Sequence, residues 1–251
     1  MPDFLYFCTV MLIKTQALVL RVVRYGDNKC IVDLLAEELG RVDVSVSVSN
    51  SPKARFSRSL FQPLNIVDVE VDYRQNRGVQ TLRSVSIAVP YVTLNTDVQK
   101  MCMMMFLSEF LYNVTKNEQQ NTLLFRYIRN SLEWLDAKNT STANFHLVFM
   151  MRLAKFVGFS PNIEDYSEGC CFDLRNGTFT VDLPLHGDVV LPDDARRIVT
   201  LLRMNYENMH LFAMSRTERN RFLDVLLKFY SIHVPNFPGL KSLEVLRSLY
   251  S

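Results

Sequence analysis

The lysine and arginine side chains of this sequence are its best candidates for binding a ligand, and they are unevenly distributed. Residues 11–90 contain eleven Lys and Arg against eight Asp and Glu, whereas residues 91–251 contain seventeen of each kind. A local excess of positive charge matters more for binding a polyanion than the formal net charge of +2 on the whole chain. The first third of the chain therefore favours nucleic acid as a partner.

The densest group of these cations is Lys53, Arg55 and Arg58, in a loop whose Ser, Asn and Pro residues cannot continue a strand. Phosphate contacts by such side chains give an affinity that falls with salt and is largely blind to base sequence. A solvated surface loop is the alternative interpretation of the same charges. Phe56 and Tyr25 are placed either to stack on bases or to fill the core. The predicted DNA-binding set also includes the cations at nearby strand ends and turns, namely Arg24, Lys29, Arg41, Arg74 and Arg77.

Motifs for catalysis or for a cofactor are missing from the sequence. No phosphate-binding loop, dinucleotide fingerprint or nucleophile elbow is present, and the histidines are scattered singly at His146, His186, His210 and His233. The adjacent Cys170 and Cys171 cannot easily point at one tetrahedral ion, and no C-x2-C partner exists. The five cysteines form no regular framework, which is typical of reduced thiols in the cytosol. We therefore predict no catalytic residue, no metal and no cofactor.

Two predicted helices each carry a pair of cations three residues apart beside apolar side chains. The pairs are Arg126 with Arg129, and Arg152 with Lys155. A groove with apolar walls and a basic rim would suit an acidic, hydrophobic peptide. Ordinary amphipathic helices with wet outer faces are the alternative, and spacing alone favours that alternative.

The segments that carry the basic residues alternate apolar and polar side chains with a period of two residues, as β-strands do. Residues 42–49 alternate valine with Asp or Ser without a break, so one face of that strand is predicted to be buried and the other wet. Five short strands, with a long connection between the third and the fourth, suit a closed OB-type barrel that leaves no sheet edge exposed. The predicted strands are residues 17–23, 30–35, 42–49, 66–73 and 79–88.

After Pro90 the period changes to that of helices. The predicted helices are residues 97–115, 119–136, 142–157, 193–206, 217–232 and 242–250, and residues 166–182 predict a short hairpin with its turn at Arg175-Asn176-Gly177. The predicted fold class is therefore α+β, with an N-terminal five-stranded OB-fold β-barrel followed by an all-α domain that carries a small hairpin insert. We expect a disordered extension at residues 1–10, a DNA-binding domain at 11–90 and a helical domain at 91–251 with its insert at about 162–185. No apolar run reaches the roughly 18 residues that a membrane span needs.

Short motifs occur in order along the chain from about residue 12 to residue 250. They are KTQALVL at 14–20, YGDN at 25–28, EELGR at 37–41, LFQPL at 60–64, TLR at 81–83, LSEFL at 107–111, FHL at 145–147, GFSP at 158–161, HV at 233–234 and LKSL at 240–243. No single motif is specific, but the ordered set is. The sequence therefore resembles the RecO family of bacterial recombinational repair proteins.

The resemblance implies an OB fold on a helical domain in a protein that is not an enzyme. It implies a cytoplasmic, nucleoid-associated protein that binds single- and double-stranded DNA and anneals complementary strands. Its implied partners are the single-strand-binding protein SSB, RecR and, indirectly, RecA, which such proteins help to load onto SSB-coated DNA. The acidic, Phe-ended tail of SSB docks in the helical domain of such proteins, which makes Arg126, Arg129, Arg152 and Lys155 the predicted site for the tail. A protein-interaction scaffold whose barrel mainly binds partner proteins is the alternative function.

One departure from the family concerns zinc. Many members carry a C-x2-C pair after the G-x-x-P segment and bind zinc there. Tyr166 and Gly169 stand where those cysteines would be expected, and only Cys170 and Cys171 are close. We predict that the hairpin, at residues 172–181, holds no metal and is stabilised by packing.

Overall fold

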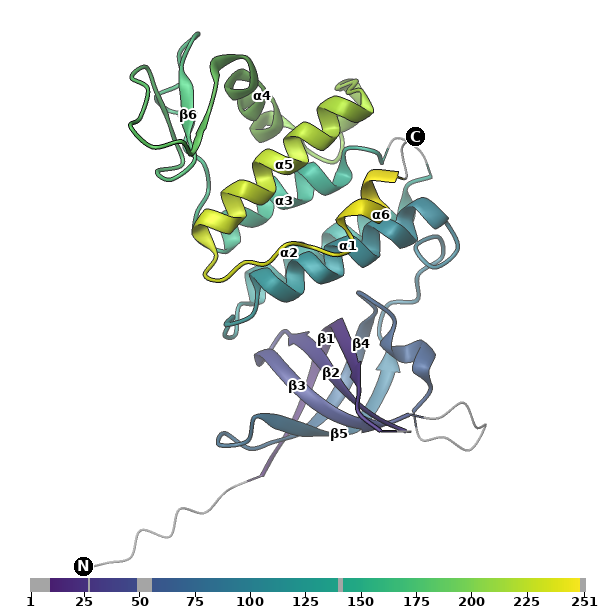
Figure 1. Cartoon of the computed structure of the whole chain (residues 1–251). Coiled ribbons are helices and arrows are strands. Elements are labelled where there is room, and N and C mark those ends of the chain that lie inside the picture. Colours follow the sequence, from purple (N-terminus) through teal and green to yellow (C-terminus); the bar gives the residue numbers. More distant parts are fainter. Residues whose placement is uncertain (1–9, 27, 49–55, 140–141, 249–251) are drawn as a thin grey trace, which may run out of the picture. The chain divides into compact units, whose positions relative to one another are not determined.

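The computed structural model describes residues 10–26, 28–48, 56–139 and 142–248, which form two compact units (Figure 1). The first unit is Met1–Tyr91 with Ser108–Arg126, and the second is Val92–Leu107 with Tyr127–Ser251. The fold is of mixed α+β class, with five strands first and helices after them. The predicted disordered extension at residues 1–10 falls, except for Val10, outside the described residues.

The strands of the first unit are β1 (Met11–Arg24), β2 (Lys29–Ala36), β3 (Gly40–Ser47), β4 (Ile66–Tyr73) and β5 (Val79–Ile87). They form a closed barrel in the order β1-β2-β3-β5-β4. β1 begins well before the predicted start at residue 17. Its first part, from Met11 to Leu18, pairs with β4, and its second part, from Ala17 to Arg24, pairs with β2. This long strand therefore pairs with β4 along its first part and with β2 along its second part. The sheet closes on itself, and the barrel has no open edge.

The alternation predicted for the third strand is present in β3. Val42, Val44 and Val46 are buried, whereas Asp43 and Ser45 between them are only half-buried. A short helical turn, η1 (Arg58–Phe61), adds the buried Phe61 to the same core. Phe56 is also buried in this core, so of the two alternatives for Phe56 the structure shows core packing.

Residues 108–126 pack against the barrel at the turn that leads into β3, where a glycine allows a close approach of their backbone. Gly40 has a φ of +68°, and a Cβ added there would clash with the backbone carbonyl of Gln119. The next amide, that of Arg41, donates a hydrogen bond to the Glu118 carbonyl at 2.9 Å. Ser108 Oγ donates to the Leu20 carbonyl at 2.6 Å. Only glycine combines this backbone conformation with so close an approach.

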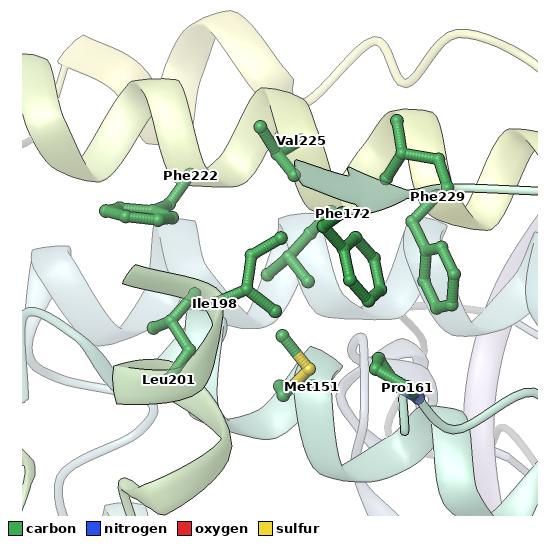
Figure 2. Close-up of a pocket in the computed structure, with 10 residues that line it drawn as sticks. Met151, Pro161, Phe172, Ile198, Leu201, Phe222, Val225 and Phe229 are labelled. Carbon is green, nitrogen blue, oxygen red and sulfur yellow. The ribbon is translucent and has the colours of Figure 1, made fainter. Parts of the chain in front are cut away.

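The helices are α1 (Val98–Val114), α2 (Thr122–Ala137), α3 (Phe145–Phe156), α4 (Pro192–Arg203), α5 (Arg216–His233) and α6 (Leu243–Ser248), with a short turn η2 (Met209–Leu211) before α5. The six helices predicted from the sequence are therefore present, with ends that differ by a few residues. In the second unit an apolar core lies among α3, α4, α5 and β6 (Cys171–Asp173) (Figure 2). Its side chains leave a cavity of about 10 Å³, which is room for one water molecule at most. The side chains of this core therefore stabilise the second unit by packing and leave no room for a ligand.

Buried polar groups tie the start of the second unit to the end of α2. Lys100 is almost fully buried, and its Nζ donates to the Leu135 carbonyl at 2.8 Å and to Thr93 Oγ1 at 2.6 Å. The Asp136 carboxylate accepts hydrogen bonds from the backbone amides of residues 92–94 at 2.7–3.1 Å. Because the last carbonyls of a helix lack partners inside it, the ammonium of Lys100 caps α2.

The predicted hairpin is present, and a third strand extends it. β6 pairs with β7 (Thr178–Thr180) on one side and with β8 (Val189–Val190) on the other. The Asp173 carboxylate accepts the backbone amides of Arg175 and Asn176, which fixes the predicted turn between β6 and β7. β8 has only two residues, which is too short to show a period of two in the sequence.

Candidate nucleic-acid interface

The predicted DNA-binding cations lie at two opposite ends of the barrel. β1, β3 and β5 run in one direction, and β2 and β4 run in the other. Arg24 ends β1 and Lys29 begins β2, so both lie at one end, here named the β1–β2 end. Arg41 near the start of β3, with Arg74 and Arg77 in the turn between β4 and β5, lies at the other end, here named the β2–β3 end.

A surface hollow of about 230 Å³ opens at the β1–β2 end. Arg24 and Arg58 supply its positive charge. Its other lining residues are Val22, Cys30, Val48, Phe61 and Gln62. Two guanidinium groups beside an apolar floor can hold a phosphate while the adjoining sugar or base contacts the aliphatic side chains.

Arg58 is held in place by the structure of its own turn. The Ser57 side chain accepts a hydrogen bond from the Ser59 amide at 3.3 Å and so caps η1. The Asn65 side-chain amide donates to the carbonyls of Ser59 and Leu60 at 3.0 and 3.1 Å. The Nε of Arg58 is buried and has no hydrogen-bond partner among the described residues. This guanidinium is therefore positioned without being neutralised within the described part of the chain.

Lys29 and Tyr25 are exposed at the same end of the barrel. Tyr25 is 47% exposed, so its ring is available to a ligand. Lys53 and Arg55, the other members of the dense basic loop, lie outside the described residues. Gln62 lines the hollow beside the two arginines and was not predicted, because a lone glutamine after a helical turn has no recognisable signal in the sequence.

Arg41, at the β2–β3 end, is engaged within the protein. Its side chain is only 10% exposed, with a guanidinium nitrogen 3.8 Å from Asp33. The same guanidinium lies 4.7 Å from the centre of the Tyr112 ring and donates to the Tyr112 carbonyl at 3.2 Å. Burial lowers the pKa of Arg41, and the carboxylates of Asp33 and Asp43 oppose this effect. An arginine used in this way has little capacity left for a phosphate.

Asp33 and Asp43 face each other across β2 and β3 beside this arginine. Burial raises the pKa of Asp33 to about 7, with a further contribution from its hydrogen bond to Asp43 and from the charge of Asp43. Arg41 and Arg21 oppose the rise. Arg21 also lies over the Tyr112 ring, 4.9 Å from its centre. The β2–β3 end therefore holds a compact group of opposite charges that balance one another.

Arg74 and Arg77 are exposed in the turn between β4 and β5. The buried Gln80 organises this turn, since its side-chain amide donates to the Arg74 carbonyl at 3.0 Å and accepts the Arg74 amide at 2.9 Å. Arg77 donates a long hydrogen bond to Thr81 at 3.4 Å. Both guanidinium groups can reach a ligand, but they lie at the end of the barrel away from the hollow.

The four cations predicted to bind the SSB tail are divided between the two units. Arg126 belongs to the first unit, where its Nε lies 3.3 Å from Glu37. Arg129 forms an ion pair with Glu133 at 2.7 Å. Tyr127 and Arg129 are two positions apart and so point to nearly opposite flanks of α2. The structure therefore separates Arg129 from the aromatic side chains that pack around Tyr127.

Arg152, by contrast, lies beside those aromatic side chains. The Tyr127 ring stacks on Phe149 and Phe156, with centroids 5.5 and 4.6 Å away, and its hydroxyl lies 2.9 Å from that of Tyr206. Arg152 lies between Phe149 and Phe156 in sequence and donates twice to the Met204 carbonyl, at 3.3 and 3.1 Å. Lys155, one turn further along α3, is exposed.

The residues near the hairpin do not fit a zinc site. Among the described residues, no three His, Cys, Asp or Glu side chains gather closely enough to hold a metal ion. Cys170 and Cys171 are buried, and the Cys170 sulfur accepts the Ser167 amide at 3.2 Å. His186 Nε2 lies 3.4 Å from the Asp173 carboxylate, so the only histidine within residues 162–191 contacts the group that fixes the turn.

Comparison with known proteins covers nearly the whole chain. Residues 11–91 match the family model "Recombination protein O N terminal", and residues 95–244 match "Recombination protein O C terminal". The chain belongs to the RecO family. The DNA repair protein RecO of Phocaeicola vulgatus is 46% identical over 241 residues, which are 96% of this chain and 100% of that protein. RecO of Bacteroides fragilis is 44% identical over the same shares, and RecO of Flavobacterium psychrophilum is 30% identical over 243 residues, again 96% of this chain and all of that protein.

Membership of the RecO family places the chain among recombination and repair proteins. The two family models meet between residues 91 and 95, close to the predicted change from strands to helices at Pro90. Within the part of the chain that the structure describes, no helix is long and apolar enough to cross a membrane.

Proposed function

We propose that this RecO-family chain is a recombination mediator without catalytic activity that binds single- and double-stranded DNA and anneals complementary strands. It helps to load RecA onto SSB-coated DNA, in the bacterial cytoplasm at the nucleoid, with SSB and RecR as partners. Family membership supports the general role. The observation that carries the DNA-binding part is the hollow at the β1–β2 end, where Arg24 and Arg58 have no ion-pair partner among the described residues.

The chemistry of annealing explains why such a hollow is useful. Two complementary strands repel each other through their phosphates, and cations that neutralise one strand lower this repulsion. A concave site that takes phosphates and leaves the bases outside keeps them free to pair. No group on the protein needs to form or break a covalent bond in this process.

Annealing of two complementary oligonucleotides coated with SSB tests the proposal. We expect the wild-type chain to accelerate annealing, and we expect R24E/R58E to lose most of this acceleration together with part of the salt dependence of DNA binding. The matched control is R196E/R203E, which makes the same change of charge on exposed positions of α4 in the second unit. Equal loss in both variants would contradict the assigned surface.

The scaffold function predicts a different outcome of the same experiment. A barrel that mainly binds partner proteins would leave DNA affinity and annealing unchanged in R24E/R58E. It would also leave them unchanged in the triple charge reversal of Lys53, Arg55 and Arg58. If the wild type is active and both variants anneal DNA equally well, the barrel does not bind DNA through these cations. Binding of partner proteins would then be the function of the barrel.

For the SSB tail, we propose the part of the predicted site on α3, where Arg152 lies next to the aromatic side chains around Tyr127 and Lys155 is exposed one turn further along the helix. An acidic tail ending in Phe needs a cation and an apolar contact together. Titrating the tail peptide into the full chain should show weaker binding to R152Q/K155Q than to R129Q, because Arg129 lies on the other flank of α2. If both variants bind the tail peptide equally weakly, the binding site includes all four predicted cations and not only the two on α3.

We also propose that the hairpin insert holds no zinc. Asp173 and its hydrogen bonds fix the turn between β6 and β7, a role that a metal would otherwise serve. Metal analysis of protein purified without a chelator should find far less than one equivalent of zinc. About one equivalent would overturn this part of the proposal.

A further inference from the structure

The three-stranded module of the second unit exposes a short apolar segment. Val181, Leu183 and Leu185, which follow β7, are 79%, 66% and 109% exposed. Large aliphatic side chains that are exposed singly are ordinary on a protein surface, but three within five residues concentrate exposed apolar area in one short segment. Exposed apolar area gathered in one place is typical of surfaces that bind a partner.

The segment is held at both ends by the module, which lies against α4 (Figure 1). Before it, β7 pairs with β6, and Thr180 Oγ1 donates to the Asp182 carbonyl at 3.1 Å. After it, the Asp188 carbonyl accepts the Leu174 amide at 3.0 Å. The Asp188 carboxylate lies 2.7 Å from Arg175 and 2.9 Å from Lys228 of α5. The apolar side chains are therefore presented by an anchored support.

The module that carries the segment is acidic, and the ring of Tyr166, which lies among these acidic residues in sequence, contacts Phe179 of β7 with centroids 5.0 Å apart. Residues 162–191 contain six Asp and Glu against one Arg, and that Arg175 is paired with Asp188. Four of the carboxylates are exposed and form no ion pair among the described residues, namely Glu164, Asp165, Glu168 and Asp182. This charge repels DNA phosphates, and it also repels the same module of a second copy of the chain. The occupant that fits is basic and apolar.

The strand that leads into the segment also offers hydrogen bonds. β7 lies at one edge of the sheet order β7-β6-β8, so on its outer side it pairs with no other strand among the described residues. An extended peptide can pair with such an edge while its alternate side chains contact neighbouring apolar groups. We propose that β7 and residues 181–185, with the acidic residues around them, bind an extended segment of a partner protein that alternates basic and apolar side chains. This surface is separate from the DNA-binding site and does not depend on it.

A peptide of alternating lysine and valine, eight residues long, is a direct probe of this surface. Fluorescence anisotropy with the full chain should show saturable binding of this peptide and none of the peptide in which glutamate replaces lysine. L183S/L185S should weaken binding by about tenfold or more, because it removes the apolar contacts from exposed positions. D182K should weaken it as well, through the charge.

The matched control is L211S, which removes a leucine that is 71% exposed in η2, outside the module. It should leave peptide binding unchanged, and all variants should keep the wild-type unfolding temperature. Equal binding of both peptides, undiminished binding by L183S/L185S, or no binding by the wild type would overturn the proposal. Sedimentation that shows a dimer lost only in L183S/L185S would also overturn it, in favour of a second copy as the occupant. DNA affinity is expected to be the same in L183S/L185S and wild type, and this separates the inference from the proposed function.

Discussion

The two ends of the barrel use the same residue type in opposite ways. At the β2–β3 end, the Arg41 side chain is 10% exposed and is surrounded by Asp33, Asp43 and the ring of Tyr112. At the β1–β2 end, Arg24 and Arg58 line an open hollow, and neither has an ion-pair partner among the described residues. Neutralisation by neighbours, more than the presence of a cation, therefore decides whether an arginine stabilises the fold or is available to a ligand.

The largest difference in stability is expected between alanine substitutions of two glycines with positive φ, one at each end of the barrel. Gly40→Ala adds a Cβ that clashes with the Gln119 backbone, at a φ of +68°, and should cost about 3 kcal/mol or more. Gly26→Ala, at a φ of +84° with no described atom within 4 Å of the added Cβ, should cost about 1 kcal/mol. The single tryptophan lies in the second unit, so hydrogen exchange of the β2 and β3 amides is the measurement of barrel stability.

Gly40→Asn separates the two causes of that cost. Asn tolerates a positive φ better than Ala, but it brings the same Cβ. We expect it to be nearly as destabilising as Ala. A barrel of wild-type stability with Asn at this position would show that the contact with Gln119 is unimportant.

Arg41→Gln is the next largest test and addresses the comparison directly. It removes a cation from the buried Asp33, the half-buried Asp43 and the Tyr112 ring, and should lower the free energy of unfolding of the barrel by about 2 kcal/mol. DNA affinity, measured by anisotropy at a temperature where the variant is folded, should be unchanged. A variant with normal stability and weaker DNA binding would mean that Arg41 is a DNA ligand after all.

The carboxyl pair at the β2–β3 end predicts a pH dependence. The pKa of Asp33 is about 7 in the folded barrel and 3.8 in its ordinary state, so between about pH 4 and 7 the folded chain binds a proton that the unfolded chain has lost. The stability of the barrel should therefore fall as the pH rises through this window and level off above pH 7. A pKa difference of about three units corresponds to at most about 4 kcal/mol over the whole window.

Asp33→Asn should remove this slope, because the amide does not titrate. Asp68→Asn, at an exposed position of β4, should keep it. Hydrogen exchange of the barrel amides measured from pH 4.5 to 8, after correction for the intrinsic exchange rate, gives both profiles. An unchanged slope in Asp33→Asn would assign the titration to another group.

The smallest effect is expected for the exposed arginines at the β2–β3 end. Arg74 and Arg77 are free to reach phosphates but lie away from the hollow. R74Q/R77Q should weaken DNA binding by about 0.5 kcal/mol and reduce the salt slope by less than R24Q/R58Q does. A larger effect in R74Q/R77Q would move the principal DNA contact to the β4–β5 turn.

Much of the fold followed from local patterns. The alternation of Val42, Val44 and Val46 predicted a half-buried strand, and the predicted limits of the fourth strand, 66–73, are those of β4. The start of β1 was missed because its two ends pair with different neighbours, and pairing is a tertiary property. β8 was missed because two residues carry no period.

For the candidate site, the sequence predicted which kinds of residue take part but not how they are arranged in space. The excess of cations in the first third, the five-stranded pattern and the ordered motifs of the RecO family could be recognised in the chain alone, since charge, periodicity and spacing are properties of its sequence. The neutralisation of Arg41 by Asp33, the hollow that Arg24 and Arg58 share, and the position of Arg129 on another flank of α2 than Tyr127 could not be predicted from local patterns. The electrostatic field at a side chain depends on the charges and rings that the fold brings near it, and these are distant in sequence.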